Sequence, residues 1–127
     1  MNEELNLMQT LGIKITAVSK QEVTATMMVL QQHLQPFGLL HGGATAALAE
    51  TVGSIGAYEN VKEKGGVPVG IELSVNHLKS VRFGEVTAVG NPIHLGKTTH
   101  LWEVNCYTED KEKFAFAKLT VLIKYEK

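Results

Sequence analysis

The sequence predicts an α+β fold in which one long helix packs against an antiparallel β-sheet. Three observations lead to this prediction: two short β-like segments come first, an alanine-rich segment of about five helical turns follows, and four further β-like segments come last. One helix is too few for a sheet that is covered by helices on both faces. We expect the 127 residues to form a single domain, 1–127.

The first two strands are expected within residues 11–30. β-Branched and apolar residues alternate in GIKITAV and in EVTATMMVL, and the polar residues Ser19, Lys20 and Gln21 separate the two runs. A β-hairpin should therefore open the fold.

A loop and then the long helix should follow the hairpin. Pro36, Gly38 and the pair Gly42-Gly43 disfavour regular structure, whereas ATAALAETVGSIGAYENVKEK is rich in alanine. Apolar residues recur along this segment at three- and four-residue spacing: Ala44, Ala47, Leu48, Thr51, Val52 and Ile55. Because most of these side chains are small, the helix can approach a sheet closely, as it would if a curved sheet wrapped around it.

Four strands are expected after Gly65 and Gly66. They are VPVGIELSVNHLKS, GEVTAVGNPIHL, THLWEVNCYTE and KFAFAKLTVLIKY, separated by RFG, GK and EDKE. In the first of them, residues 69, 71, 73 and 75 are apolar and share one parity, which predicts a buried side. The same parity places His77 in line with that buried side.

The composition excludes several classes of protein. Twelve basic and 13 acidic residues give no overall field that would attract nucleic acid or an anionic membrane. No apolar run approaches the roughly 20 residues of a membrane span, and MNEELNLMQT does not resemble a secretion signal. With one cysteine, Cys106, expected as a buried strand thiol, we expect a cytoplasmic protein.

Residues 35–54 carry the pattern that predicts chemistry. QPFGLLHGG precedes the helix, and Glu50 and Ser54 lie on it. Backbone amides at a helix start, aided by the helix dipole, stabilise a carbonyl oxygen as it gains negative charge, and Gly42 lets a substrate approach them. Glu50 is a candidate nucleophile or base, while Ser54 lies four residues on and could orient Glu50 or hold water. Gln35 can donate and accept hydrogen bonds in the loop.

The spacing of these residues also predicts a shared site. Glu50 is roughly 10 to 12 Å along the helix from Gly42, so its carboxylate would act on a carbonyl held by Gly42 of a partner subunit. Taken singly, each residue has an ordinary explanation: Glu50 as a solvated helix residue, His41 as a helix-start residue and Ser54 as a small packing residue. Their joint arrangement favours acyl transfer.

The segment LQPFGLLHGGATAALAETVGS closely resembles the active-site loop and central helix of hotdog-fold acyl-CoA thioesterases. The resemblance is to the branch that contains phenylacetate-pathway, 4-hydroxybenzoyl-CoA and 1,4-dihydroxy-2-naphthoyl-CoA enzymes, and it extends through the strands. It implies a sheet wrapped around one central helix and hydrolysis of an aromatic or medium-chain acyl-CoA. Glu50 would be nucleophile or general base, Gly42 would donate its amide to the thioester oxygen, Gln35 and His41 would shape that site, and Ser54 would hold water.

The resemblance also implies where CoA binds and how the chain assembles. CoA is part of the substrate, so no cofactor is expected, and it would lie along a subunit interface. The matching residues, whose cations and hydroxyl suit phosphates, are His77, Lys79, Ser80, Arg82, His94 and Lys97. The assembly would be a homodimer or a dimer of dimers, hence a homotetramer. The five histidines are scattered without metal-ligand spacing, so we expect no metal, and we expect no nucleic-acid or membrane partner.

Two other functions remain open at this point. A hotdog dehydratase or hydratase would need a histidine and an acid converging on one substrate carbon, whereas His41 here precedes Gly42. A non-catalytic acyl-CoA-binding module would be expected to carry an attached DNA-binding domain, for which 127 residues leave no room. The acyl group itself is not specified; apolar candidates for its pocket are Phe37, Leu40, Tyr58 and Met27.

Overall fold

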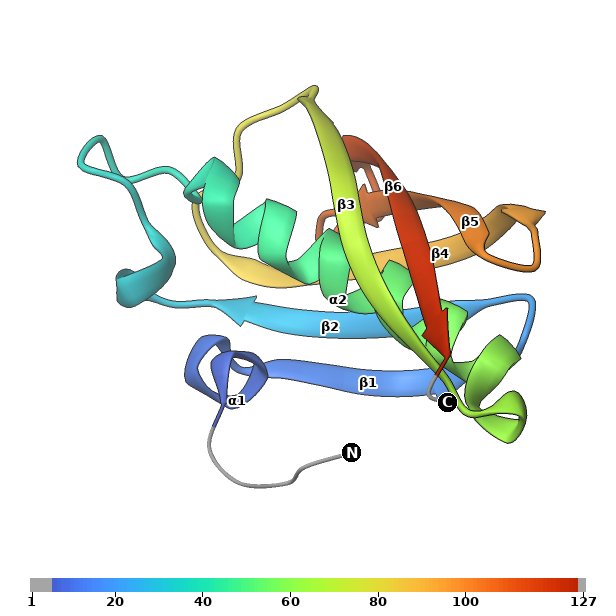
Figure 1. The fold of residues 1–127 in the computed structure, drawn as a ribbon. Helices are drawn as coiled ribbons and strands as arrows, with labels where there is room; N and C mark the ends of the chain where they lie inside the picture. The colour runs from blue at the N-terminus through green and yellow to red at the C-terminus, as the bar shows by residue number, and fades with distance from the viewer. Residues whose placement is uncertain (1–5, 126–127) are drawn as a thin grey trace.

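The computed structural model describes residues 6–125 and confirms the predicted α+β fold (Figure 1). Helix α2 (Gly42–Val61) lies against a six-stranded antiparallel sheet with the strand order β1-β2-β4-β5-β6-β3. The strands are β1 (Ile13–Val18), β2 (Val23–Val29), β3 (Gly66–His77), β4 (Gly84–Leu95), β5 (Thr99–Tyr107) and β6 (Lys113–Tyr125). The sheet curves around the helix, which is the hotdog arrangement.

The strands lie close to where the sequence placed them. The β1–β2 hairpin is confirmed, with Oγ of Ser19 accepting hydrogen bonds from the amides of Gln21 and Glu22 in its turn. β4 and β6 have the predicted bounds. β3 ends at His77 and not at Ser80, because the amides of Leu78 and Lys79 both bond to the carbonyl of Phe114 instead of continuing the ladder.

Three short helices complete the described chain: α1 (Leu7–Leu11), η1 (Gln31–His33) and η2 (Lys62–Lys64). The sequence interpretation missed α1, which is only five residues long. Its start is fixed by Asn6, whose side chain accepts hydrogen bonds from the amides of Met8 and Gln9. Its end is fixed by Gly12, which has a left-handed φ of 75° that suits glycine.

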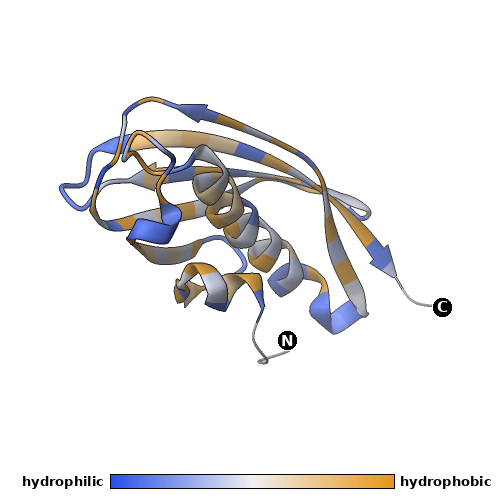
Figure 2. Ribbon diagram, turned by 90° about the vertical axis from the view of Figure 1, so that its left-hand side faces the viewer, coloured by the Kyte–Doolittle hydropathy of each residue, from blue (hydrophilic) through white to orange (hydrophobic). Residues whose placement is uncertain are grey.

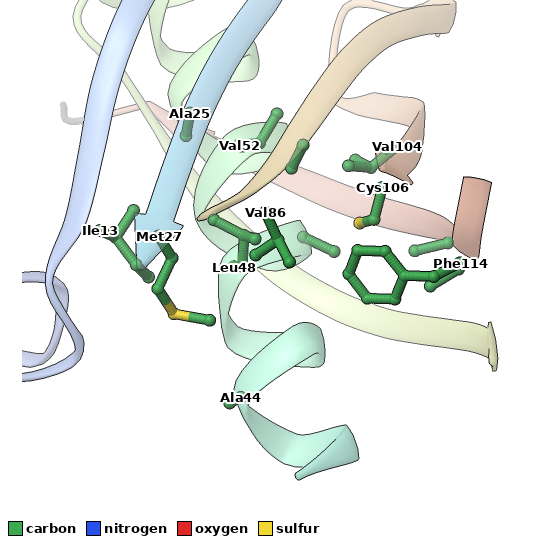
Figure 3. Close-up of a cluster of buried hydrophobic side chains, with 14 of the residues drawn as sticks. Ile13, Ala25, Met27, Ala44, Leu48, Val52, Val86, Val104, Cys106 and Phe114 are labelled. Carbon is green, nitrogen blue, oxygen red and sulfur yellow. The ribbon is translucent and has the colours of Figure 1, made fainter. Parts of the chain in front are cut away.

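Helix α2 begins two residues before the predicted segment and is buried more widely than the predicted stripe. Ala49, Gly53, Gly56 and Ala57 are also buried. A Cβ at Gly56 would lie 2.4 Å from the Trp102 ring, so the ring packs directly on the helix backbone. Figure 3 shows part of the resulting core, with side chains of the sheet gathered along α2. Small residues therefore allow the close approach that the sequence predicted.

The burial predicted for β3 is partly wrong. Three β3 residues lie on the inner side of the sheet: Leu73, Val75 and His77. Their partners on β6 are Leu119, Ala117 and Ala115, which face α2. Val69 and Ile71, predicted to share it, are 38% and 57% exposed. The reason is a β-bulge between Gly70 and Glu72, which reverses the parity of the strand because side chains alternate with a period of two.

In Figure 2, which colours the ribbon by hydropathy, hydrophobic residues occur in both sheet and helix, and the helix also carries hydrophilic residues. Among residues 6–125, no helix is long and apolar enough to cross a membrane.

Candidate functional site

The loop before α2 is held in shape by Gln35. Its side-chain oxygen accepts hydrogen bonds from the backbone amides of Phe37 and Leu39, and its backbone amide donates to the carbonyl of Leu39. Gly38, with a left-handed φ of 82°, makes the tight turn. Gln35 therefore organises the loop through its side-chain carbonyl oxygen, and it also lines a pocket beside the helix start.

His41 caps the N-terminus of α2. Its Nδ1 accepts a hydrogen bond of 2.8 Å from the amide of Gly43, and its backbone amide donates to the carbonyl of His33. The next amides, of Ala44 and Thr45, bond to the carbonyl of His41. Within the described chain the amide of Gly42 has no acceptor, so it is the free donor at this helix start.

A pocket of about 230 Å³ opens in front of that free amide. Its lining includes Gln35, Gly42, His77, Lys79 and Ser80. The imidazole of His77 packs on Gly42, because a Cβ there would lie 3.1 Å from Cε1 of His77. The structure thus brings the predicted oxyanion residue together with three of the predicted CoA residues.

Glu50 lies in a different pocket, on the side of α2 between α1 and β3. This pocket of about 540 Å³ is mainly apolar, and its polar members include Glu50, Ser54 and Tyr58. Its wall is completed by Leu7 and Met8 of α1, Pro68 of β3, and Ala47, Thr51 and Ile55 of α2. Glu50 and Ser54 therefore share one helix face, as predicted.

The Glu50 carboxylate has no polar partner in the described part of the chain. It is exposed, and no hydrogen bond or ion pair to it occurs within residues 6–125. The hydroxyl of Ser54 likewise has no partner in that part of the chain, whereas the hydroxyl of Thr51 is taken up by the carbonyl of Ala47 at 2.7 Å. Ser54 is thus the hydroxyl beside Glu50 that can hold a water.

Glu50 and Gly42 do not converge within one chain. Eight residues separate them along α2, which corresponds to about 12 Å. The two pockets that they line share no residue.

The predicted CoA residues fall into two groups at opposite ends of α2. His77, Lys79 and Ser80 lie at its start. Lys97 lines a pocket of about 590 Å³ at its end, beside Asn60, Val61 and Lys64 of the helix region and Leu95, Gly96, His100 and Tyr125 of the sheet. Because a 20-residue helix is about 30 Å long, the two groups cannot meet one phosphate in one chain.

The remaining predicted CoA residues belong to these same ends. A Cβ at Gly38 would lie 3.9 Å from Nη1 of Arg82, which puts the guanidinium beside the loop before α2. His94 lies near Gly96, where a Cβ would be 2.8 Å from its Nε2. The sequence interpretation missed Lys64 as a second cation near Lys97; no spacing signal connects residues so far apart in the chain.

Of the four candidates for the acyl pocket, Met27 is wrong, whereas the single chain does not test Phe37. Met27 is buried in the main core, and Phe37 is 84% exposed on the loop. Leu40 lines the pocket of Gly42, and Tyr58 lines the pocket of Glu50.

Two other reactive side chains, Cys106 and His100, are buried. Cys106 is fully buried in β5, as predicted, and burial raises the pKa of its thiol to about 12. Burial also lowers the pKa of His100, although a hydrogen bond to the backbone of Gly96 opposes this shift. In the stretch from Asn6 to Tyr125, no three His, Cys, Asp or Glu side chains are grouped as metal ligands would be.

Comparisons with known proteins identify the family of the chain. Residues 37–115 match the model of the thioesterase superfamily. The chain is 37% identical to 1,4-dihydroxy-2-naphthoyl-CoA hydrolase of Listeria monocytogenes, covering 94% of this chain and 97% of that protein. It is 40% identical to the proofreading thioesterase EntH of Cronobacter turicensis, covering 92% and 85%.

A solved structure shows the same fold. The crystal structure of thioesterase HI1161 from Haemophilus influenzae superposes with a TM-score of 0.91 at 38% identity, covering 96% of this chain and 85% of that one. The family match, the relatives and the shared hotdog fold make the enzyme class thioester hydrolase. The chain therefore belongs to the thioesterase superfamily.

Proposed function

We propose that the protein hydrolyses an acyl-CoA to a free acid and CoA, with Glu50 as nucleophile or general base and Gly42 as the oxyanion donor. The observation that supports the proposal is that, within residues 6–125, the carboxylate of Glu50, the nearby hydroxyl of Ser54 and the first amide of the same helix all lack a hydrogen-bond partner. An acyl pocket needs mostly apolar walls with a few polar groups, and the pocket of Glu50 and Ser54 has that character.

In the general-base route, Glu50 takes a proton from a water held by Ser54. The hydroxide attacks the carbonyl carbon, and the amide of Gly42 stabilises the oxyanion, aided by the helix dipole. The C–S bond then breaks, and the CoA thiolate takes up the proton that Glu50 removed from the water, which restores the carboxylate. In the nucleophilic route, Glu50 itself attacks, CoA leaves, and water hydrolyses the resulting anhydride. The same residues serve both routes.

The reaction requires Gly42 and Glu50 to come from two subunits, because they are about 12 Å apart along one helix. β3 offers the surface for pairing. It is an edge strand of 12 residues with exposed Val67, Val69 and Ile71, and a long apolar edge is a template for pairing with another chain. We infer a homodimer joined along β3; two dimers would form the tetramer.

A dimer also gives the divided CoA residues a role. If two subunits pair side by side in opposite directions, the start of one α2 helix lies near the end of the other. Lys79 and Arg82 of one subunit and Lys97 and Lys64 of its partner would then border one channel. Four cations of this kind suit the pyrophosphate and 3′-phosphate of CoA.

We propose an aromatic acyl group as the preferred substrate. The relative from Listeria is named for a dihydroxynaphthoyl-CoA, and Tyr58, Met8 and Pro68 line the pocket of Glu50 with groups that can pack on a ring. The dehydratase alternative is disfavoured, because Nδ1 of His41 is occupied by the amide of Gly43 and the ring caps the helix.

The test is release of free thiol from benzoyl-, hydroxybenzoyl-, phenylacetyl-, dihydroxynaphthoyl- and straight-chain acyl-CoAs by the wild type and by Glu50→Ala. We expect aromatic substrates to be preferred and kcat to fall on the order of a thousandfold in the variant. Glu63→Ala in η2, at the far end of the helix, is the matched control and should keep full activity. Full activity in Glu50→Ala would exclude the proposed mechanism, and no thiol release from any substrate by the wild type would exclude hydrolysis of these esters.

A further inference from the structure

Gly70 of β3 lies against the carboxylate of Glu50. A Cβ at Gly70 would be 2.6 Å from Oε2 of Glu50 and 3.3 Å from its Cδ. Both are distances at which one of the two groups has to move. The carboxylate therefore occupies the space that any other residue at position 70 would fill with its side chain.

The backbone does not explain why position 70 is glycine. The glycines with left-handed φ in the described chain are Gly12, Gly38, Gly65 and Gly84, and Gly70 is not among them. Alanine could adopt the same conformation, and glycine within a strand weakens it. Room for a neighbour is one physical reason for glycine here, beside the β-bulge that follows it.

That neighbour is chiefly Glu50. The other close group is Cδ1 of Leu119, at 3.3 Å from the added Cβ, and a Leu methyl at this distance needs to give way by only a few tenths of an ångström. Glu50 has no hydrogen bond or ion pair within residues 6–125 that could hold its carboxylate elsewhere. In this structure Oε2 lies in the space that a side chain at position 70 would fill.

The bulge of β3 begins at the same residue. The register shifts between Gly70 and Glu72, and a bulge bends its strand and increases the local twist. Gly70 is the last residue before the shift, and it faces α2 opposite Glu50. At Gly70, the point of β3 nearest to the Glu50 carboxylate, the strand therefore both bends and lacks a side chain.

We propose that Gly70 is a positioning residue, which sets the place of the Glu50 carboxylate by leaving a side-chain-sized space on β3. This inference rests on the proposed role of Glu50. The expected consequence of a methyl group at position 70 is a carboxylate displaced from the thioester, in a protein that folds and still binds its substrate.

The first measurement compares Gly70→Ala with wild type in kcat, KM and Tm. A displacement of about 1 Å at a reacting group can cost about a hundredfold, so we expect kcat to fall roughly 10- to 100-fold while KM stays within about twofold. We expect Tm to change by no more than a few degrees. An unchanged kcat would overturn the proposal.

Gly90→Ala in β4 is the matched control. It also adds one methyl between the sheet and α2, where a Cβ would lie 2.5 Å from Cγ1 of the buried Val52. We expect this variant to lower Tm and to keep the kcat of the folded enzyme. An equal loss of kcat in both variants would mean that general strain, and not Glu50, is responsible.

The decisive measurement places Gly70→Ala in a Glu50→Asp background. Aspartate lacks one methylene, so its carboxylate withdraws from β3 and no longer meets the added methyl. Glu50→Asp alone lowers kcat, but Gly70→Ala should then cost less than about threefold more, a clear departure from additivity. The same fold-loss in both backgrounds would overturn the proposal.

Glu50→Gln, measured in parallel, separates two kinds of failure. If Glu50→Gln keeps the wild-type kcat, the proposed function of Glu50 is wrong and the role of Gly70 falls with it. If Glu50→Gln is inactive and Gly70→Ala keeps the wild-type kcat, only the positioning role is wrong.

Discussion

The ammonium of Lys79 and the carboxylate of Glu112 form an ion pair at 2.5 Å, which joins the chain just after β3 to the residue before β6. The hydrogen bond and the charge of Lys79 hold the pKa of Glu112 below its usual range. The cation that we propose for a CoA phosphate therefore already has an anionic partner, and the phosphate has to compete with Glu112.

Glu112→Gln should therefore tighten the binding of CoA. The change removes the competing charge and leaves Lys79 in place. We expect the inhibition constant of free CoA to fall roughly two- to fivefold at low salt and the gain to vanish at high salt, because both side chains are about half exposed and the pair is screened. The inhibition constant is measured by adding free CoA to the thiol-release assay.

The control for this experiment is Glu85→Gln. Glu85 lies at the start of β4 and lines a separate pocket with Tyr107 and Lys111. Glu85→Gln changes the net charge by the same amount as Glu112→Gln and leaves the ion pair of Lys79 in place. If both variants shift the inhibition constant equally, net charge and not the ion pair decides the affinity.

His41→Ala should weaken the start of α2 and the oxyanion site together. Loss of the bond from the amide of Gly43 to Nδ1 removes the helix cap, and such losses cost about 1 kcal/mol. We expect Tm to fall by a few degrees and kcat to fall at least tenfold, since the amide of Gly42 lies in the same turn.

His41→Asn separates the two effects. Asparagine caps helices through its side-chain oxygen, so this variant should recover Tm. If kcat also recovers, His41 serves the site through the cap alone. If kcat stays low although Tm recovers, the imidazole itself takes part in the reaction. A Tm that is unchanged in His41→Ala would contradict the capping role.

The elements of this fold could be predicted from the sequence because each depends on local patterns. Alternation identified β4 and β6 to the residue, and alanine content with three- and four-residue spacing identified α2. The bulge at Gly70 could not be predicted, since a shift of register depends on the pairing of β3 with β6 and not on β3 alone. Because the bulge was not foreseen, the prediction placed Val69 on the inner side of the sheet, where it does not lie.

The parts of the candidate site that lie on one segment could be predicted from the sequence, including the separation of Glu50 from Gly42 along α2, whereas contacts between distant segments could not. Gln35, Gly42, Glu50 and Ser54 lie within 20 residues of one another, so a motif can carry them. Lys79 and Lys97 lie at opposite ends of α2, and this separation depends on the tertiary fold, which their spacing in the sequence does not reveal. The contact between Gly70 and Glu50 is of the same kind.

Stability should fall as the pH is lowered through the range in which an unfolded histidine takes up a proton, because of His100. Burial lowers the pKa of His100, so the folded protein resists the proton that the unfolded chain accepts near its ordinary pKa of about 6.5. Stability then rises with pH where the unfolded state binds more protons, with a limit of about 1.4 kcal/mol per pH unit for one group.

The groups around His100 act on its pKa in both directions, since the backbone of Gly96 raises it. His94 lowers its pKa by charge, and Lys64 and Lys97 line the same pocket, together with Tyr125. We expect Tm to fall between about pH 7.5 and pH 5.5 and the fall to be smaller in His100→Gln, which stays neutral. Thermal melts across this range check it. The same pH dependence in both proteins would assign the effect to other groups.

Lysines on the outer edge should separate the subunits and inactivate the enzyme without touching Glu50. Val69 and Ile71 are exposed on β3, and charges on an edge strand oppose pairing. We expect Val69→Lys/Ile71→Lys to elute as a monomer in size-exclusion chromatography with light scattering and to lose at least about a hundredfold in kcat. The monomer should keep its far-UV circular dichroism, because these side chains lie outside the core.

The opposite edge of the sheet supplies the control for this prediction. β1 has only six residues and carries a register shift between Ile15 and Ala17, so it is a poor template for pairing. Val18→Lys, at an exposed position of β1, should leave both mass and activity unchanged. A β3 variant that becomes monomeric and keeps full activity would show that one chain holds a complete site. Such a result would require Gly42 and Glu50 to approach each other within a single subunit, which their eight-residue separation on a straight helix does not allow.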